Sequence, residues 1–231
     1  MVLMWVAFLP QAKAQTFEAV APTGQTLNFW LEDGEAVVGN HSGVTGALTI
    51  PASVTYDGTA YPVTRLTWNA FNSCSGLTSV TLPPSVTFVG SGSFSGCTSL
   101  TQVHFGGTLA QWVGIDWDSW GANPLQVAHH LYIGGQEVTD AVIPEGVSLI
   151  KQYSFYGCTG LETVTFPSTL DSVGYNAFGE CSGLARVYCT SLADWCGIGF
   201  ADDWNANPLQ YAHKLYVGGS RVQGTMTIPA G

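Results

Sequence analysis

Apolar residues recur along this chain at a fixed spacing that points to a repeated structural unit. Four segments align, and they are AFNSCSGLTSVTLPPSV from Ala70, SFSGCTSLTQVHFGGTL from Ser93, SFYGCTGLETVTFPSTL from Ser154 and AFGECSGLARVYCTSL from Ala177. Twenty-three residues separate Phe71 from Phe94, and the same step separates Phe155 from Phe178. The pattern therefore predicts successive coils of about 23 residues, each contributing apolar side chains at the same positions.

Within one coil the pattern predicts a short strand and a return turn. Alternation along LTSVTLP places Leu77, Val80 and Leu82 inward. It places Ser79, Thr81 and Pro83 outward. A 23-residue period with this L-x-x-L-x-L pattern is typical of leucine-rich repeats. Because no coil can bury its apolar side alone, neighbours must stack. We expect a β-rich solenoid, an array of about 23-residue coils with a parallel sheet on one face.

A longer repeat overlays the short one. Phe71 and Phe155 are 84 residues apart, and the intervening segments match: LAQWVGIDWDSWGANPLQVAHHLYIGGQEV from Leu109 and LADWCGIGFADDWNANPLQYAHKLYVGGSRV from Leu192. The unit is therefore two short coils plus a longer variant turn, and it occurs nearly twice. The final MTIPAG matches AVIPEG, which precedes the third short coil. We expect the repeats to span residues 67–231 and the array to be cut off at its C-terminal end.

Two segments precede the repeats. Residues 15–66 contain Asp33-Gly34 and Asp57-Gly58, which are hairpin turn signals, and ALTIPASV from Ala47 resembles the strand half of a coil. We interpret this segment as an N-terminal β cap that shields the first coil. Residues 1–14 hold a short apolar run and an A-x-A pattern, which predict a signal peptide. Because the basic start of such a signal is missing, we expect truncation there. An apolar N-terminal strand is the alternative.

Charge narrows the choice of partner. The formal net charge is −10, with 6 Lys and Arg residues against 16 Asp and Glu residues. Such a chain repels a phosphate backbone and an anionic membrane surface, so nucleic acid is not expected as a partner. No stretch is long and apolar enough to predict a membrane span. We expect a monomer.

The signature AFxxCxxLxxVxxPxSVxxVG, with the interposed W…NPL…AH.LY..G..V…IP, resembles the BspA-like leucine-rich-repeat family of bacterial surface proteins. The resemblance covers about residues 27–231. It implies an exported, non-catalytic binding protein, secreted or at the bacterial cell surface, with a role in adhesion or protein–protein interaction. The implied partner is a protein on a host or bacterial surface. No sorting or attachment module is visible, so the means of anchoring is left open.

Large polar or aromatic side chains mark the candidate contact residues. On strands whose other outward residues are small, Gln102 and His104 stand out, as do Arg186 and Tyr188 at the equivalent positions. Ordinary surface decoration is the alternative. In the variant turns, exposed aromatic rings could stack on sugars, which gives a second hypothesis of a glycan-binding module. The candidates there are Trp117, Trp120 and Trp204, whereas Trp112 and Trp195 are expected to be buried.

The remaining reactive residues favour structural roles. Cys74, Cys97, Cys158 and Cys181 repeat with the coils, which predicts buried free thiols. Cys189 and Cys196 replace Phe105 and Val113 of the first copy, which is compatible with a local disulfide. His129 and His213 are repeat equivalents that we expect to bond the turn backbone. We expect no metal site, no cofactor and no catalytic residue, because no metal, nucleophile or phosphate-binding motif is present.

Overall fold

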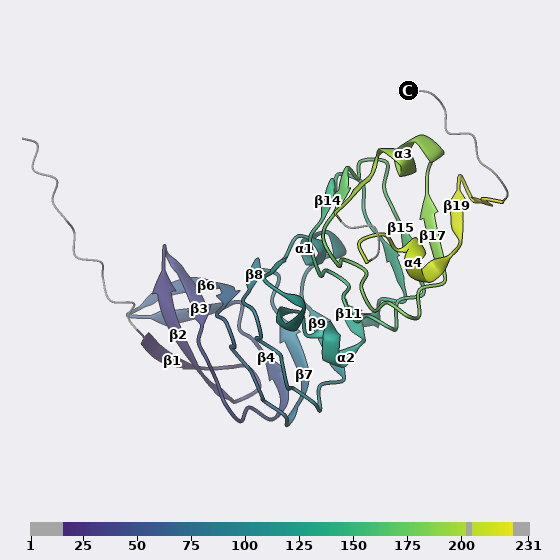
Figure 1. The fold of residues 1–231 in the computed structure, drawn as a ribbon. Coiled ribbons are helices and arrows are strands. Elements are labelled where there is room, and N and C mark those ends of the chain that lie inside the picture. Colours follow the sequence, from purple (N-terminus) through teal and green to yellow (C-terminus); the bar gives the residue numbers. More distant parts are fainter. Residues whose placement is uncertain (1–15, 202–204, 224–231) are drawn as a thin grey trace, which may run out of the picture.

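The computed structural model describes residues 16–201 and 205–223. The predicted signal peptide, Trp204 and the final MTIPAG lie outside the described residues. Figure 1 shows an elongated arrangement that runs from the N-terminal hairpins at one end to β19 at the other. Short strands, mostly parallel, form several sheets along this length.

The principal ladder carries the strand predicted for each coil. In the first half it consists of β4 (Gly46–Thr49), β7 (Leu77–Leu82), β9 (Gln102–Phe105), β11 (Leu131–Ile133) and the edge strand β12 (Gln136–Glu137). In the second half it consists of β13 (Asp140–Val142), β15 (Thr163–Thr165), β17 (Arg186–Cys189), β19 (Leu215–Val217) and β20 (Ser220–Arg221). We call the outward surface of these two sheets the broad face.

The register confirms the 23-residue coil. Val80 pairs with Val103 in the first half, and Val164 pairs with Val187 in the second. The variant turns lengthen the sequence separation between paired residues of neighbouring strands, since Val103 pairs with Leu131. A single continuous sheet does not form. The edge of β11 is occupied by the antiparallel strand β12, so β13 begins a new sheet instead of pairing with β11.

A second ladder lies on another side of the coils. It contains β3 (Glu35–Val38), β6 (Thr59–Leu66), β8 (Phe88–Val89) and β10 (Asp116–Trp117), and then β14 (Leu149–Ile150), β16 (Ser172–Val173) and β18 (Gly199–Phe200). The N-terminal hairpins extend it with β1 (Thr16–Val20), β2 (Thr26–Glu32) and β5 (Ser53–Tyr56). Both predicted turns join antiparallel strands. β3 and β4 already pair in parallel with β6 and β7, so the coil ladders begin inside the predicted cap segment.

The repeated apolar residues form one continuous core between the ladders. Phe71 stacks on Phe94 with ring centroids 5.7 Å apart, and Phe155 stacks on Phe178 at 5.3 Å. The predicted inward residues of the first coil, Leu77, Val80 and Leu82, are fully buried. Pro83 was expected to point outward and is instead buried, because strand β7 ends at Leu82 and the alternation ends with it.

The variant turns fold into short helices. They are α1 (Leu109–Val113), the 3-10 turn η1 (Trp120–Ala122) and α2 (Leu125–Ala128) in the first copy, and α3 (Leu192–Gly197) and α4 (Leu209–Ala212) in the second. His129 and His213 end α2 and α4 in the left-handed conformation. Nδ1 of His129 donates a hydrogen bond to the carbonyl of Gly157, at 2.8 Å. His129 thus bonds the backbone of the next coil, as predicted for this residue.

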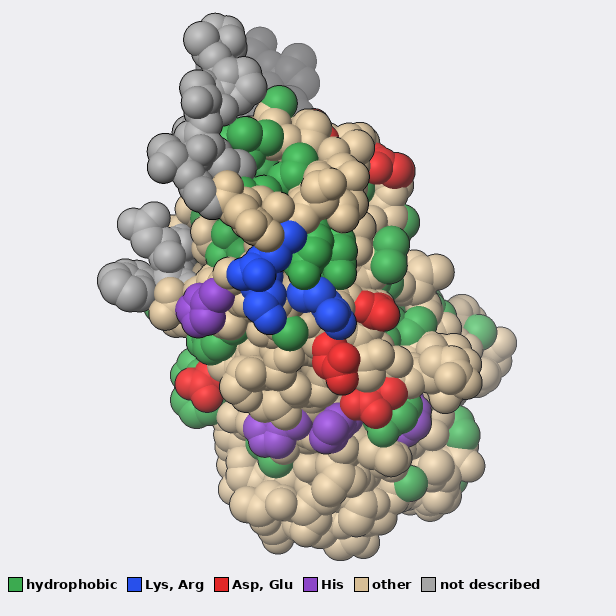
Figure 2. Space-filling model, turned by 90° about the vertical axis from the view of Figure 1, so that its right-hand side faces the viewer, with side chains coloured by type: hydrophobic (Ala, Val, Ile, Leu, Met, Phe, Trp, Pro, Cys, Tyr) green, Lys and Arg blue, Asp and Glu red, His purple; other side chains and the backbone are tan. Residues whose placement is uncertain are grey.

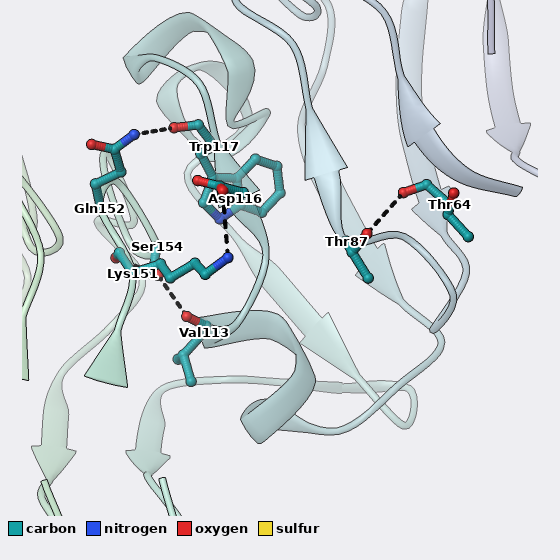
Figure 3. Close-up of polar contacts among 8 residues, drawn as sticks. All are labelled: Thr64, Thr87, Val113, Asp116, Trp117, Lys151, Gln152 and Ser154. Atoms are coloured by element: carbon teal, nitrogen blue, oxygen red, sulfur yellow. Dashed lines mark hydrogen bonds and ion pairs between the residues drawn. The ribbon is translucent and has the colours of Figure 1, made fainter. Parts of the chain in front are cut away.

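The first variant turn also joins the two halves, and Figure 3 shows part of this junction. Nζ of Lys151 lies 3.5 Å from a carboxylate oxygen of Asp116. Nε2 of Gln152 donates to the carbonyl of Trp117, and Oγ of Ser154 donates to the carbonyl of Val113. These bonds link the first variant turn to the segment that follows β14. Within the described residues, no helix is long and apolar enough to cross a membrane.

Candidate binding surfaces

Two aromatic pairs stand on the broad face at equivalent positions of the long repeat. The imidazole of His104 stacks on Tyr132 with centroids 4.9 Å apart and an interplanar angle of 26°. Tyr188 stacks on Tyr216 at 4.8 Å and 27°. Each pair joins register partners on neighbouring parallel strands, so the spacing of the strands sets the spacing of the rings.

The structure places the four broad-face candidates on the surface. Gln102 and Arg186 are exposed, and His104 and Tyr188 are half-buried because each has one ring face covered by its stacking partner. Sequence reasoning missed those partners, Tyr132 and Tyr216. The sequence does hold a signal for them, because both copies of AH-x-LY place a tyrosine directly after a leucine. In a strand whose leucine is buried, the next side chain points outward.

The three tryptophans proposed for the variant turns differ in their surroundings. Trp117 is 0% exposed and packs against Trp112, so its interpretation as an exposed stacking residue is wrong. Trp117 lies on strand β10 and pairs with Val89 of β8 in the second ladder, which turns its side chain into the core. Trp120 is 52% exposed. Trp204 lies outside the described residues. Trp112 is buried as expected, and Trp195 is half-buried.

Trp120 borders a groove of about 410 Å³ that lies across the junction. Tyr156 and Tyr211 also line it, together with Glu180. The hydroxyl of Tyr211 accepts a hydrogen bond from the backbone N–H of Glu180 and donates one to Oδ1 of Asn205. Trp120 comes from the first half of the molecule, and Tyr156 and Tyr211 come from the second. A smaller hollow of about 270 Å³ lies beside the cap, between Trp30, Trp68 and Arg65.

The cysteines at the repeated position are buried free thiols. The thiol of Cys97 donates to the carbonyl of Phe71, and that of Cys181 donates to the carbonyl of Phe155. Burial raises the pKa of Cys97 and of Cys158 to about 12, because a thiolate loses its hydration there. Such thiols are poor nucleophiles and poor metal ligands at neutral pH.

The two additional cysteines are separate from this ladder. Cys189 is buried, Cys196 is exposed on α3, and both are free thiols in the structure. Burial raises the pKa of Cys189 to about 11. In residues 16–201 and 205–223, no three His, Cys, Asp or Glu side chains gather as they would around a metal ion.

Comparisons with known proteins identify one family and several similar solved structures. The family model of the BspA type leucine rich repeat region matches residues 59–112 and 127–196 in six copies. Comparison with curated proteins gives no match. Among solved structures, the chain is similar to a leucine rich cell surface protein from Faecalibacterium prausnitzii, with 24% identity and a TM-score of 0.45. That match covers 74% of this chain and 55% of the other chain.

Two further solved structures are similar. A leucine-rich repeat protein from Bacteroides ovatus has 21% identity and a TM-score of 0.41, and the match covers 70% of this chain and 45% of that one. One from Bacteroides capillosus has 25% identity and a TM-score of 0.38, covering 71% and 94%. The chain thus spans about half the length of the Faecalibacterium and B. ovatus proteins. Because the family model matches more than half of the sequence, this chain belongs to the BspA-type leucine-rich-repeat family.

Proposed function

We propose that this chain is an exported, non-catalytic binding protein of the bacterial cell surface, in which the coils stack as one solenoid and the broad face binds a protein partner. The observation that carries the proposal is the recurrence of a stacked aromatic pair at the same place in both long repeats. Aromatic residues on a rigid surface lose little conformational entropy on binding and are common at the energetic centres of protein interfaces.

The strand order supports the broad face as the contact surface. Its strands are joined by backbone hydrogen bonds on both sides, so the aromatic side chains are held at fixed positions. Two equivalent pairs give a partner two contact points, and simultaneous contact at both raises the affinity above that of either alone. Location outside the cell rests on the apolar segment and A-x-A pattern of residues 1–14, together with the surface location that the family resemblance implies.

A capture experiment tests the proposal. The full chain is immobilised and exposed to a panel of purified extracellular-matrix proteins and to intact bacterial cells. The double variants His104→Ala/Tyr132→Ala and Tyr188→Ala/Tyr216→Ala should each weaken capture about tenfold or more, which corresponds to roughly 1.4 kcal/mol. Thr49→Ala, an outward change on β4, two strands away from His104, is the matched control and should leave capture unchanged. Capture that is equal in all variants would exclude the broad face.

The groove beside Trp120 favours an alternative function, the binding of a glycan. Trp120, Tyr156 and Tyr211 surround a space large enough for one or two sugar rings, and Glu180 and His129 offer polar contacts. A glycan array separates the two proposals. Specific glycan signals that Trp120→Ala abolishes, combined with no capture of any protein, would favour the glycan-binding function.

A further inference from the structure

The few basic side chains of this acidic chain are not evenly distributed. Arg65 lies 3.4 Å from a carboxylate oxygen of Glu32, and Lys151 pairs with Asp116 across the junction. The other three basic side chains of the described residues are Arg186, Lys214 and Arg221, on or beside β17, β19 and β20. We call these three the cationic patch. Figure 2, which views the molecule from the side of β17 and β19, shows Lys and Arg side chains gathered on one face.

The register places the three patch residues next to one another. Val187 and Leu215 are partners, so the residues that precede them, Arg186 and Lys214, lie side by side. Arg221 is the antiparallel partner of Tyr216 and therefore shares the broad face with the Tyr188–Tyr216 stack. All three cations are exposed, and none has an ion pair within residues 16–201 and 205–223.

The first long repeat holds other residues at the same positions. Gln102, His130 and Glu137 stand there in place of Arg186, Lys214 and Arg221. Nδ1 of His130 lies 2.6 Å from a carboxylate oxygen of Glu137, so this fold brings the second and third positions into direct contact. In the second repeat the same contact would join Lys214 to Arg221, two like charges.

Like charges at neighbouring positions of a sheet are destabilising, and a carboxylate at either position would remove the repulsion. The second repeat instead holds three cations at adjacent positions of a chain whose formal net charge is −10. The arrangement is unfavourable in the free protein and becomes favourable when an anionic group lies among the three side chains. The cationic patch therefore has the properties of a site for carboxylates.

We propose that the cationic patch binds an acidic polypeptide segment of the protein partner, with Asp or Glu carboxylates contacting Arg186, Lys214 and Arg221. This inference rests on the proposed function, because it names the chemistry of the partner at one part of the broad face. The Tyr188 and Tyr216 rings cover each other's facing surfaces and present edges and hydroxyl groups, which hydrogen-bond a peptide better than they stack on a sugar. Strands about 5 Å apart also space the cations for carboxylates along an extended chain.

The experiment measures fluorescence polarisation of a labelled peptide of ten glutamates with the full chain. We expect saturable binding at low salt that weakens markedly at about 0.15 M salt, because the contacts are exposed. The triple variant Arg186→Gln/Lys214→His/Arg221→Glu carries the residues of the first repeat, which this scaffold already accommodates. It should lower the affinity at least tenfold.

The reverse exchange provides a gain-of-binding test that a merely unfolded variant cannot mimic. Gln102→Arg/His130→Lys/Glu137→Arg should raise the number of bound peptides per chain from one to two. Unchanged binding in the triple variant, or no binding by the wild type, would overturn the proposal. A sulfated tetrasaccharide of similar charge that binds the patch more tightly than the peptide would also overturn it, in favour of an anionic glycan.

Failure here can be told apart from failure of the proposed function. If the glutamate peptide does not bind but the wild type captures a protein and the Tyr188→Ala/Tyr216→Ala variant does not, only the acidic-segment inference is lost. If neither the peptide nor any protein binds, both proposals are lost.

Discussion

At the scale of single residues, each coil depends on two positions in the left-handed backbone conformation. They lie two residues before and two residues after the core phenylalanine, for example Asn69 and Ser73 around Phe71. Glycine adopts this conformation without strain, whereas other residues do so at a cost of about 1 kcal/mol. At Gly157, which follows Phe155 by two residues, a second constraint is added by the neighbouring coil. A Cβ there would lie 2.7 Å from Cα of Gln126 and 2.9 Å from the carbonyl oxygen of Leu125.

Replacement of this glycine separates the two constraints. Gly157→Ala should destabilise the chain by about 2–4 kcal/mol, because it combines backbone strain with a collision against α2. Gly146→Ala is the matched control, since Gly146 has a φ of +89° and nothing within 4 Å of the added Cβ. It should cost only about 1 kcal/mol. Urea unfolding followed by circular dichroism measures both, and equal losses would mean that the close approach to α2 is unimportant.

Some residue-level features could be predicted from the sequence, and others could not. Periodicity identified the buried phenylalanines and thiols, because they repeat with the coils. It did not separate Trp117 from Trp120, although Trp120 recurs as Trp204 in the second copy and Trp117 has no tryptophan equivalent there. The burial of Trp117 depends on β10, a two-residue strand whose pairing with β8 turns the Trp117 side chain inward. Periodicity has no signal for so short an element.

At the scale of elements, the first variant turn decides how the two halves of the chain meet. Hydrogen bonds between α1, α2 and the next coil take the place of sheet pairing here. Asn123 is fully buried at this point. Its Nδ2 donates to the carbonyls of Tyr153 and Ser154, and its Oδ1 accepts from the backbone N–H of Leu125. Nε1 of Trp112 donates to the same Ser154 carbonyl, at 2.8 Å.

Removal of the Asn123 side chain should therefore weaken the junction. We expect Asn123→Ala to cost about 2–4 kcal/mol, because a buried residue loses its partners and leaves the Tyr153 carbonyl without this donor. Among the described residues, the side chain of the equivalent Asn207 has one such bond, in which its Oδ1 accepts from the N–H of Leu209. Asn207→Ala should cost only about 1 kcal/mol. Thermal unfolding compares the two, and hydrogen exchange at Phe155 and Cys158 should accelerate only in the Asn123 variant. Equal effects would contradict the role given to Asn123.

The sequence predicted most elements but not the interruption of the sheet. The β2–β3 and β5–β6 hairpins of the N-terminal segment, the strands of the short coils and the lengthened step at the variant turns follow from turn residues and alternation. The β11–β12 hairpin was missed because its glycines, Gly134 and Gly135, were interpreted as part of the variant turn. Its consequence is large, since β12 occupies the edge on which a continuous sheet would grow.

At the scale of the whole molecule, the two long repeats offer the same geometry with different chemistry. Both carry an aromatic pair on the broad face at equivalent positions. Beside it, the first repeat has the hydrogen-bonded pair His130 and Glu137, and the second has the cationic patch. A partner that contacts both repeats would therefore use similar aromatic contacts twice and acidic groups once. This asymmetry would fix the orientation in which the partner binds along the two repeats.

Hydroxyl-radical footprinting of the chain in complex with the captured partner tests this account most directly. Oxidation of each aromatic side chain is quantified by mass spectrometry in the free and bound states. The broad-face assignment predicts that Tyr132, Tyr188 and Tyr216 are protected in the complex, while Trp120 and Tyr175, which are exposed in the structure, are oxidised as in the free chain. Protection of Trp120 with unchanged oxidation of the three tyrosines would contradict it and place the binding site in the junction groove.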